Sequence, residues 1–132
     1  MSQNRRSPGY YGAKVEEWVL QKYGLERSYE HVNGVSMDAV TEDGTPVEIK
    51  AVACNRRGGR ANEVRFKVWR DQHEALKRAS GVYVFVTYLL RKDGIRVRNS
   101  RSVRSSSLSI QWYGETVPRG EEQAEIPAHE LF

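Results

Sequence analysis

Three charged residues stand close together in the segment SMDAVTEDGTPVEIKAV. Glu48 and Lys50 are two residues apart in an otherwise apolar stretch, and Asp38 precedes them across the turn at 42–44. Strand side chains alternate, so Glu48 and Lys50 share one face, and a hairpin brings Asp38 within reach of Glu48. Two neighbouring carboxylates repel each other unless a cation lies between them, and an oxygen-only site favours Mg²⁺ or Mn²⁺ over zinc. The alternative is an exposed strand face on which Lys50 pairs with a carboxylate.

Two further polar residues lie on faces that should be apolar. Glu16 stands beside the apolar stripe that contains Val19, and no cation lies three or four residues away from it in the predicted helix. Its partner must therefore come from elsewhere in the fold. Gln72 lies on the line of Trp69 and Leu76, which is expected to meet the sheet, so its amide must hydrogen-bond a buried group. Each residue alone fits an ordinary satisfied polar group, but the convergence of such polar residues on one sheet edge indicates a site.

The elements that position these residues follow from hydrophobic periodicity and turn residues. Apolar residues recur at helical spacing before Gly24 and before Gly81, which predicts two helices. The turn residues at 42–44 and 92–94 each predict a hairpin. The expected elements, in chain order, are a helix at Tyr10–Tyr23, strands at Ser28–Val32, Val35–Thr41 and Pro46–Ala53, a helix at Trp69–Ser80, and strands at Val82–Leu90, Ile95–Val103 and Leu108–Tyr113.

This order of elements predicts an α/β domain. A right-handed crossover through the second helix would make the strands at 46–53 and 82–90 parallel, which gives a mixed sheet with both helices packed on it. A chain of 132 residues, 39% of them hydrophobic, suits one domain spanning 1–132, with an acidic tail from residue 118 that is expected to be peripheral. The single cysteine, Cys54, forms no intrachain disulfide, which suits a cytoplasmic protein, and no apolar run reaches the length of a membrane span.

The net charge of +4 is unevenly distributed. Residues 56–104 carry 14 basic and 4 acidic residues, whereas residues 1–55 carry 6 and 8 and residues 105–132 carry 1 and 5. A strongly basic segment between acidic ends is a candidate contact surface for a polyanion such as nucleic acid. The alternative is a well-solvated charged surface.

The chain resembles the PD-(D/E)xK nuclease superfamily over about residues 9–90. The resemblance consists of a helical glutamate, then Met37-Asp38 with methionine in place of proline, then the sequence EIK, and then a helical glutamine. Within the superfamily, GAKVEEWV is similar to the Gly-x-x-x-Glu opening of archaeal Holliday-junction resolvases. The resemblance implies a restriction-endonuclease-like mixed β-sheet flanked by helices, and a metal-dependent endodeoxyribonuclease.

The resemblance also implies roles for individual residues. Asp38 and Glu48 would hold Mg²⁺ or Mn²⁺, helped by the carbonyl of Ile49 and by Glu16 directly or through water. The metal would polarise the scissile phosphate and lower the pKa of the attacking water. Lys50 would stabilise charge that develops in the transition state or position the water, and Gln72 would orient Lys50 or the nucleophile. The implied site residues are Glu16, Asp38, Glu48, Ile49, Lys50 and Gln72.

The basic segment would then contact DNA. The glycine-rich loop NRRGGRAN follows the catalytic strand, and its arginines would contact the phosphates flanking the cleaved bond. The residues expected at this surface are Arg56, Arg57, Arg60, Lys67 and Arg70, with Arg96, Arg98, Arg101 and Arg104 extending it.

Two other readings remain open, namely a sequence-specific restriction-like or repair nuclease of the same fold, and a non-catalytic nucleic-acid-binding domain. The intact Asp, Glu and Lys argue against the second of these. Because one site cuts one strand, we also expect a homodimer, with Val82–Leu90, Ile110, Trp112 and Tyr113 as candidate interface residues. The competing outcome is a monomer that nicks single strands.

Overall fold

The computed structural model describes residues 8–28, 31–32, 34–54, 64–113 and 122–132. Its centre is a mixed five-stranded sheet in the order β1-β4-β5-β7-β8. Two helices and a two-stranded ribbon of β6 and β9 accompany this sheet, so the predicted α/β class is confirmed. The elements are α1 (Pro8–Tyr23), β1 (Glu26–Arg27), β2 (His31–Val32), β3 (Val35–Ser36), β4 (Ala39–Val40), β5 (Pro46–Ala53), β6 (Arg65–Trp69), α2 (Arg70–Arg78), β7 (Val82–Arg91), β8 (Gly94–Arg104) and β9 (Gln123–Pro127), with short 3-10 turns at Ser105–Ser107 and Ala128–Glu130.

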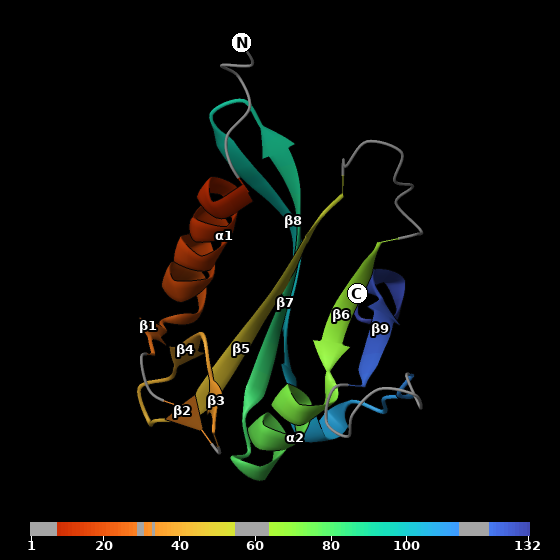
Figure 1. Ribbon diagram of the computed structural model, residues 1–132. Coiled ribbons are helices and arrows are strands. Elements are labelled where there is room, and N and C mark those ends of the chain that lie inside the picture. The colour runs from red at the N-terminus through yellow and green to blue at the C-terminus, as the bar shows by residue number, and fades with distance from the viewer. Residues whose placement is uncertain (1–7, 29–30, 33, 55–63, 114–121) are drawn as a thin grey trace.

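Two apolar cores lie on opposite faces of the sheet. Figure 1 shows α1 on one side and the ribbon of β6 and β9 on the other, with α2 at the lower end. On the α1 side, Val15 and Val19 pack in one buried cluster with Val47 of β5. On the ribbon side, Phe66 packs on Phe85 with ring centroids 5.0 Å apart. The sheet is therefore covered on both faces, as its apolar central strands require.

The two central strands, β5 and β7, run parallel, as predicted. Their register sets Glu48 beside Tyr83 and Lys50 beside Phe85. Because side chains alternate along a strand, these four side chains share the face that α2 and the ribbon cover, whereas Ile49 packs with the α1 cluster. The two charged residues thus point to the side of the sheet that α2 and the ribbon cover.

The hairpin between β4 and β5 forms at the predicted turn. The carboxylate of Asp43 accepts hydrogen bonds from the hydroxyls of Thr41 and Thr45, and Gly44 has a φ of 88°. Such an Asx-type turn closed by a left-handed glycine fixes where the two strands meet. The strand expected at Val35–Thr41 is nevertheless divided into β3 and β4, because Asp38 departs from the strand pattern between them.

Several expected elements differ from the structure. The strand expected at Ser28–Val32 is replaced by β1 and β2, on either side of residues 29–30, which lie outside the described residues. The region 108–113 contains no strand and only a single bridge, from Tyr113 to Gln123. β6 was not expected, although its alternation of exposed and buried residues is regular. Within the described residues, no helix is long and apolar enough to cross a bilayer.

The acidic tail is not peripheral from residue 122 onward. β9 pairs antiparallel with β6 along its whole length. Ile126, Ala128 and Leu131 are buried in the same cluster as Phe66 and Leu76. Apolar residues alternate with polar ones along β9, so only one face of the strand is buried. Because few apolar residues stand among the glutamates of this segment, its sequence did not predict a buried strand.

Candidate active site

The hairpin brings Asp38 to Glu48. Ala39 is paired with Val47, so the residue before it, Asp38, stands opposite Glu48. The Asp38 carboxylate Oδ2 accepts a hydrogen bond from the backbone N–H of Ile49 at 2.8 Å. Immediately before β4 begins, the Asp38 side chain thus satisfies a donor that a longer strand would have paired with a backbone carbonyl. The carboxylate is consequently held at the edge of β5, in contact with that of Glu48.

Glu48 is a buried acid. Its side chain is 3% exposed, and its Oε2 has no hydrogen-bond partner among the described residues. Burial first, and then the contact with Asp38, raise the pKa of Glu48 to about 9, although the nearby Lys50 lowers it in part. At neutral pH and without a cation, Glu48 therefore holds a proton. The buried, unpartnered oxygen beside a second carboxylate is the least satisfied polar group in the described core.

Lys50 is held by the second helix. Its Nζ donates a hydrogen bond to Oε1 of Gln72 at 2.8 Å. Gln72 lies in the first turn of α2, where its backbone N–H donates to Oδ1 of Asp71 at 2.7 Å. The structure thus brings together Lys50 and Gln72, which are 22 residues apart in the chain. The amide fixes the direction of the ammonium group without neutralising its charge.

The face of α2 that meets the sheet differs from the predicted one. The helix begins at Arg70, after Trp69, and the indole is 39% exposed. The buried residues of the helix are His73, Ala75 and Leu76. Trp69 belongs to β6 instead, because the strand alternation of that segment continues up to the helix.

A buried pair that the sequence did not indicate lies next to Glu48. Tyr83 is fully buried, and its hydroxyl is 2.8 Å from Nδ1 of His73. Burial and the charge of Glu48 raise the pKa of Tyr83, whereas burial lowers the pKa of His73. The hydroxyl and the imidazole thus satisfy each other by one hydrogen bond inside the core. Trp112 packs against His73 with ring centroids 5.6 Å apart, which closes this side of the site.

Glu16 has a partner other than a metal. Its Oε1 accepts a hydrogen bond from the guanidinium of Arg27 at 2.9 Å, so the expected partner from elsewhere in the fold is Arg27. Arg27 is paired with Ala39, which neighbours Asp38. Glu16 does not join Asp38 and Glu48 in one cluster of ligands. The ion pair engages Oε1 of Glu16, and the role of Glu16 as a metal ligand stays a prediction.

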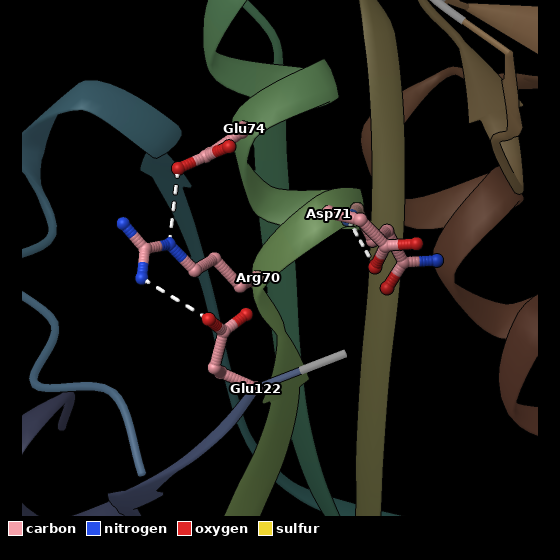
Figure 2. Close-up of polar contacts among 5 residues, drawn as sticks. Arg70, Asp71, Glu74 and Glu122 are labelled. Carbon is pink, nitrogen blue, oxygen red and sulfur yellow. Dashed lines mark hydrogen bonds and ion pairs between the residues drawn. The ribbon is translucent and has the colours of Figure 1, made fainter. Parts of the chain in front are cut away.

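The expected DNA-contact residues have different surroundings. Arg56, Arg57 and Arg60 lie outside the described residues. Lys67 is exposed on β6. Figure 2 shows the guanidinium of Arg70 between two carboxylates, at 3.1 Å from Glu74 and 3.5 Å from Glu122. Because these ion pairs compensate its charge, Arg70 is a weaker candidate for phosphate contact than Lys67.

The residues present fit a divalent cation. The unpartnered Oε2 of Glu48 and the carboxylate of Asp38 supply the oxygen donors that Mg²⁺ and Mn²⁺ prefer. In the part of the chain that the structure describes, no group of three or more His, Cys, Asp or Glu side chains forms a metal site. The remaining ligands would therefore be backbone oxygens, water or the substrate itself, which is the usual pattern for Mg²⁺.

A comparison with protein-family models identifies the class of this protein. The model described as PD-(D/E)XK nuclease superfamily domain matches residues 1–132, the whole chain. The chain therefore belongs to the PD-(D/E)XK nuclease superfamily. Comparison with curated proteins and with solved structures gave no match. The superfamily part of the resemblance seen in the sequence is confirmed, whereas the likeness to Holliday-junction resolvases stays a prediction.

Proposed function

We propose that the protein is a divalent-metal-dependent DNA endonuclease that hydrolyses phosphodiester bonds. The observation that carries the proposal is the pair of converging carboxylates, Asp38 and Glu48, in which one buried oxygen has no partner. Membership of the PD-(D/E)XK nuclease superfamily also supports a nuclease. When bound, Mg²⁺ or Mn²⁺ would supply charge stabilisation at the scissile phosphate and a more acidic water.

The remaining site residues act through position and charge. Lys50, held by Gln72, presents an ammonium group on the same face as Glu48, where negative charge develops during phosphoryl transfer. The backbone carbonyl of Ile49 is proposed as a further ligand. Glu16 would contribute only through water or after release from Arg27.

Phosphate contact is assigned to the basic middle of the chain. We propose Arg56, Arg57, Arg60 and Lys67 for this role and omit Arg70, whose guanidinium is already paired. Such contacts position the duplex and carry no sequence information. Resolution of DNA junctions, by contrast, is a specialisation that needs a test with branched substrates.

The test is cleavage of supercoiled plasmid and of linear duplex, single-stranded, flap and four-way-junction DNA, each with Mg²⁺, Mn²⁺ or EDTA. Asp38→Asn and Glu48→Gln should each reduce cutting by at least about 100-fold, the scale for loss of a group that stabilises transition-state charge. Both variants keep the shape of the site, because glutamine resembles the protonated Glu48 of the metal-free protein and asparagine keeps an acceptor for Ile49.

The matched control is Glu42→Gln, which removes an exposed carboxylate from the same hairpin and should cut like the wild type. Cutting by Glu48→Gln at the wild-type rate would disprove the site. DNA binding without any cutting, in every metal, would instead favour the non-catalytic domain.

A further inference from the structure

The outer face of the ribbon carries two exposed aromatic side chains in one row. Trp69 is 39% exposed and Tyr113 is 61% exposed. Trp69 is paired with Gln123 of β9, and Tyr113 exchanges backbone hydrogen bonds of 2.8 and 3.1 Å with the same Gln123. Directly opposed residues of antiparallel strands point to the same face, so the two rings stand on either side of Gln123. Two strand spacings separate their backbones by about 10 Å.

The same face carries positive charge. Arg65 and Lys67 alternate with the buried residues of β6 and are exposed beside Trp69. Neither takes part in an ion pair among the described residues. Across the ribbon, Pro127 stands opposite Arg65 and Glu125 opposite Lys67. One face thus combines exposed rings with two cations that have no partner in the described fold.

One end of this face leads directly into the helix that carries Gln72. Trp69 is the last residue of β6, and α2 follows without a loop. Gln72, which holds Lys50, lies three residues further on, in the first turn of that helix. The backbone of Trp69 is therefore about one helical turn, or roughly 5 Å along the axis, from that of the glutamine that positions Lys50.

We propose that the outer face of the β6–β9 ribbon binds an unpaired nucleic-acid strand next to the cleavage site. Trp69 and Tyr113 stack on bases, and Arg65 and Lys67 contact phosphates. Exposed rings on a sheet surface with neighbouring cations are the common device for binding single strands, since every base offers an aromatic face and every nucleotide a negative charge. The inference rests on the proposed nuclease function and deepens it, because it selects substrates with a single-stranded segment.

The test is equilibrium binding in EDTA, which prevents cutting. The probes are a fluorescent oligo-dT of about 12 nucleotides, within the range that such surfaces cover, and a blunt duplex of the same length. Trp69→Ala and Tyr113→Ala should each weaken oligo-dT binding by about 5- to 150-fold, the effect of losing one stacked base. Duplex binding should not change, and Trp69→Phe should restore most of the affinity. Phe132→Ala removes the third exposed aromatic of the described residues, outside the row, and serves as the control.

Two charge variants keep the test valid if an aromatic variant fails to fold. Lys67→Gln should weaken oligo-dT binding and lower the slope of log K against log salt by about 0.7, the value for one phosphate contact on a single strand. Glu125→Gln, across the ribbon, should strengthen binding. Thermal unfolding of each variant establishes that it is folded.

The outcomes separate this inference from the proposed function. Unchanged oligo-dT affinity in folded Trp69→Ala and Lys67→Gln would overturn the inference, even if the wild type cuts DNA and Asp38→Asn does not. A self-association that Trp69→Ala abolishes, without any effect on oligo-dT binding, would also overturn it by making the face a contact between copies. Weakened oligo-dT binding in a chain that cuts no DNA would uphold the binding face and reject the nuclease.

Discussion

At the level of single residues, burial and a missing hydrogen-bond partner make the carboxyl group of Glu48 suited to bind a cation. A carboxylate with 3% exposure and an unpartnered oxygen is costly to ionise, so the metal-free protein keeps a proton there. A divalent cation would take the place of that proton and satisfy the same oxygen. Metal binding by the folded protein should thus release a proton at neutral pH.

This predicts a pH dependence of stability for the metal-free protein. The pKa of Glu48 is raised from 4.5 to about 9, so between these values the folded chain holds a proton that the unfolded chain has lost. The free energy of unfolding in EDTA should therefore fall as the pH rises from 7 to 9, by at most about 1.4 kcal/mol per pH unit. This pH range lies above the ordinary pKa of histidine, about 6.5. The lowered pKa of His73 therefore affects the free energy of unfolding only below about pH 6.5.

Urea denaturation in EDTA measures the effect. Glu48→Gln should flatten the decline between pH 7 and 9. In a parallel titration without EDTA, Mn²⁺ should stabilise the wild type more at pH 9 than at pH 7. An equally steep decline in Glu48→Gln would show that another group causes it.

At the scale of elements, the site depends on where three elements meet. Near the start of β7, Gly81 donates its N–H to the carbonyl of Leu76 at 2.8 Å, and its carbonyl accepts hydrogen bonds from Ser105. This junction joins α2, the beginning of β5 and the end of β8. It therefore fixes the register that sets Tyr83 beside Glu48.

A side chain at Gly81 should disrupt this junction. A Cβ there would lie 2.3 Å from Cδ1 of Leu76 and 2.9 Å from the backbone oxygen of Pro46. Gly81→Ala should cost about 1–3 kcal/mol of unfolding free energy, the range for overpacking a filled core. Gly12→Ala is the matched control, since nothing lies within 4 Å of its Cβ, and it should stabilise α1 by up to about 1 kcal/mol. Chemical denaturation decides, and equal stability of both variants would contradict the tight junction.

At the scale of the whole molecule, the structure changes the expected interface. The proposed dimer surface included β7, but β7 is a central strand whose residues Tyr83 to Thr87 are buried. β8 is one of the two edge strands of the sheet, and four arginines along it disfavour pairing with a second copy of itself. Among the described residues, the exposed large hydrophobic side chains are Trp69, Tyr113 and Phe132. We assign two of them, Trp69 and Tyr113, to the binding of an unpaired nucleic-acid strand.

We therefore predict a monomer of 15.1 kDa in the absence of DNA. With one site per chain, it should convert supercoiled plasmid to nicked circles before linear product appears. Light scattering at micromolar concentration and a cleavage time course provide the measurements. A mass of twice that of the chain, with linear product formed at once, would restore the homodimer expected from the sequence.

The local features of the candidate site can be predicted from the sequence alone. Alternation along Pro46–Ala53 and the turn at 42–44 placed Glu48 and Lys50 on one face with Asp38 opposite, and the structure retains this arrangement. The helical periodicity of α1 followed in the same way, whereas the parallel pairing of β5 with β7 followed from the right-handed crossover rule. Periodicity and turn chemistry act within a few residues, so they can be read along the chain.

The contacts between groups far apart in the chain could not be predicted from the sequence. The pairing of Glu16 with Arg27 depends on β1 lying beside β4, and the pairing of Tyr83 with His73 depends on where α2 begins. The position of β9 follows from its pairing with β6, more than 50 residues away in the chain. Such contacts arise because exposed apolar faces must be covered and buried polar groups must find partners, and several segments of similar pattern compete for each position. That competition is resolved by the packing of the whole domain.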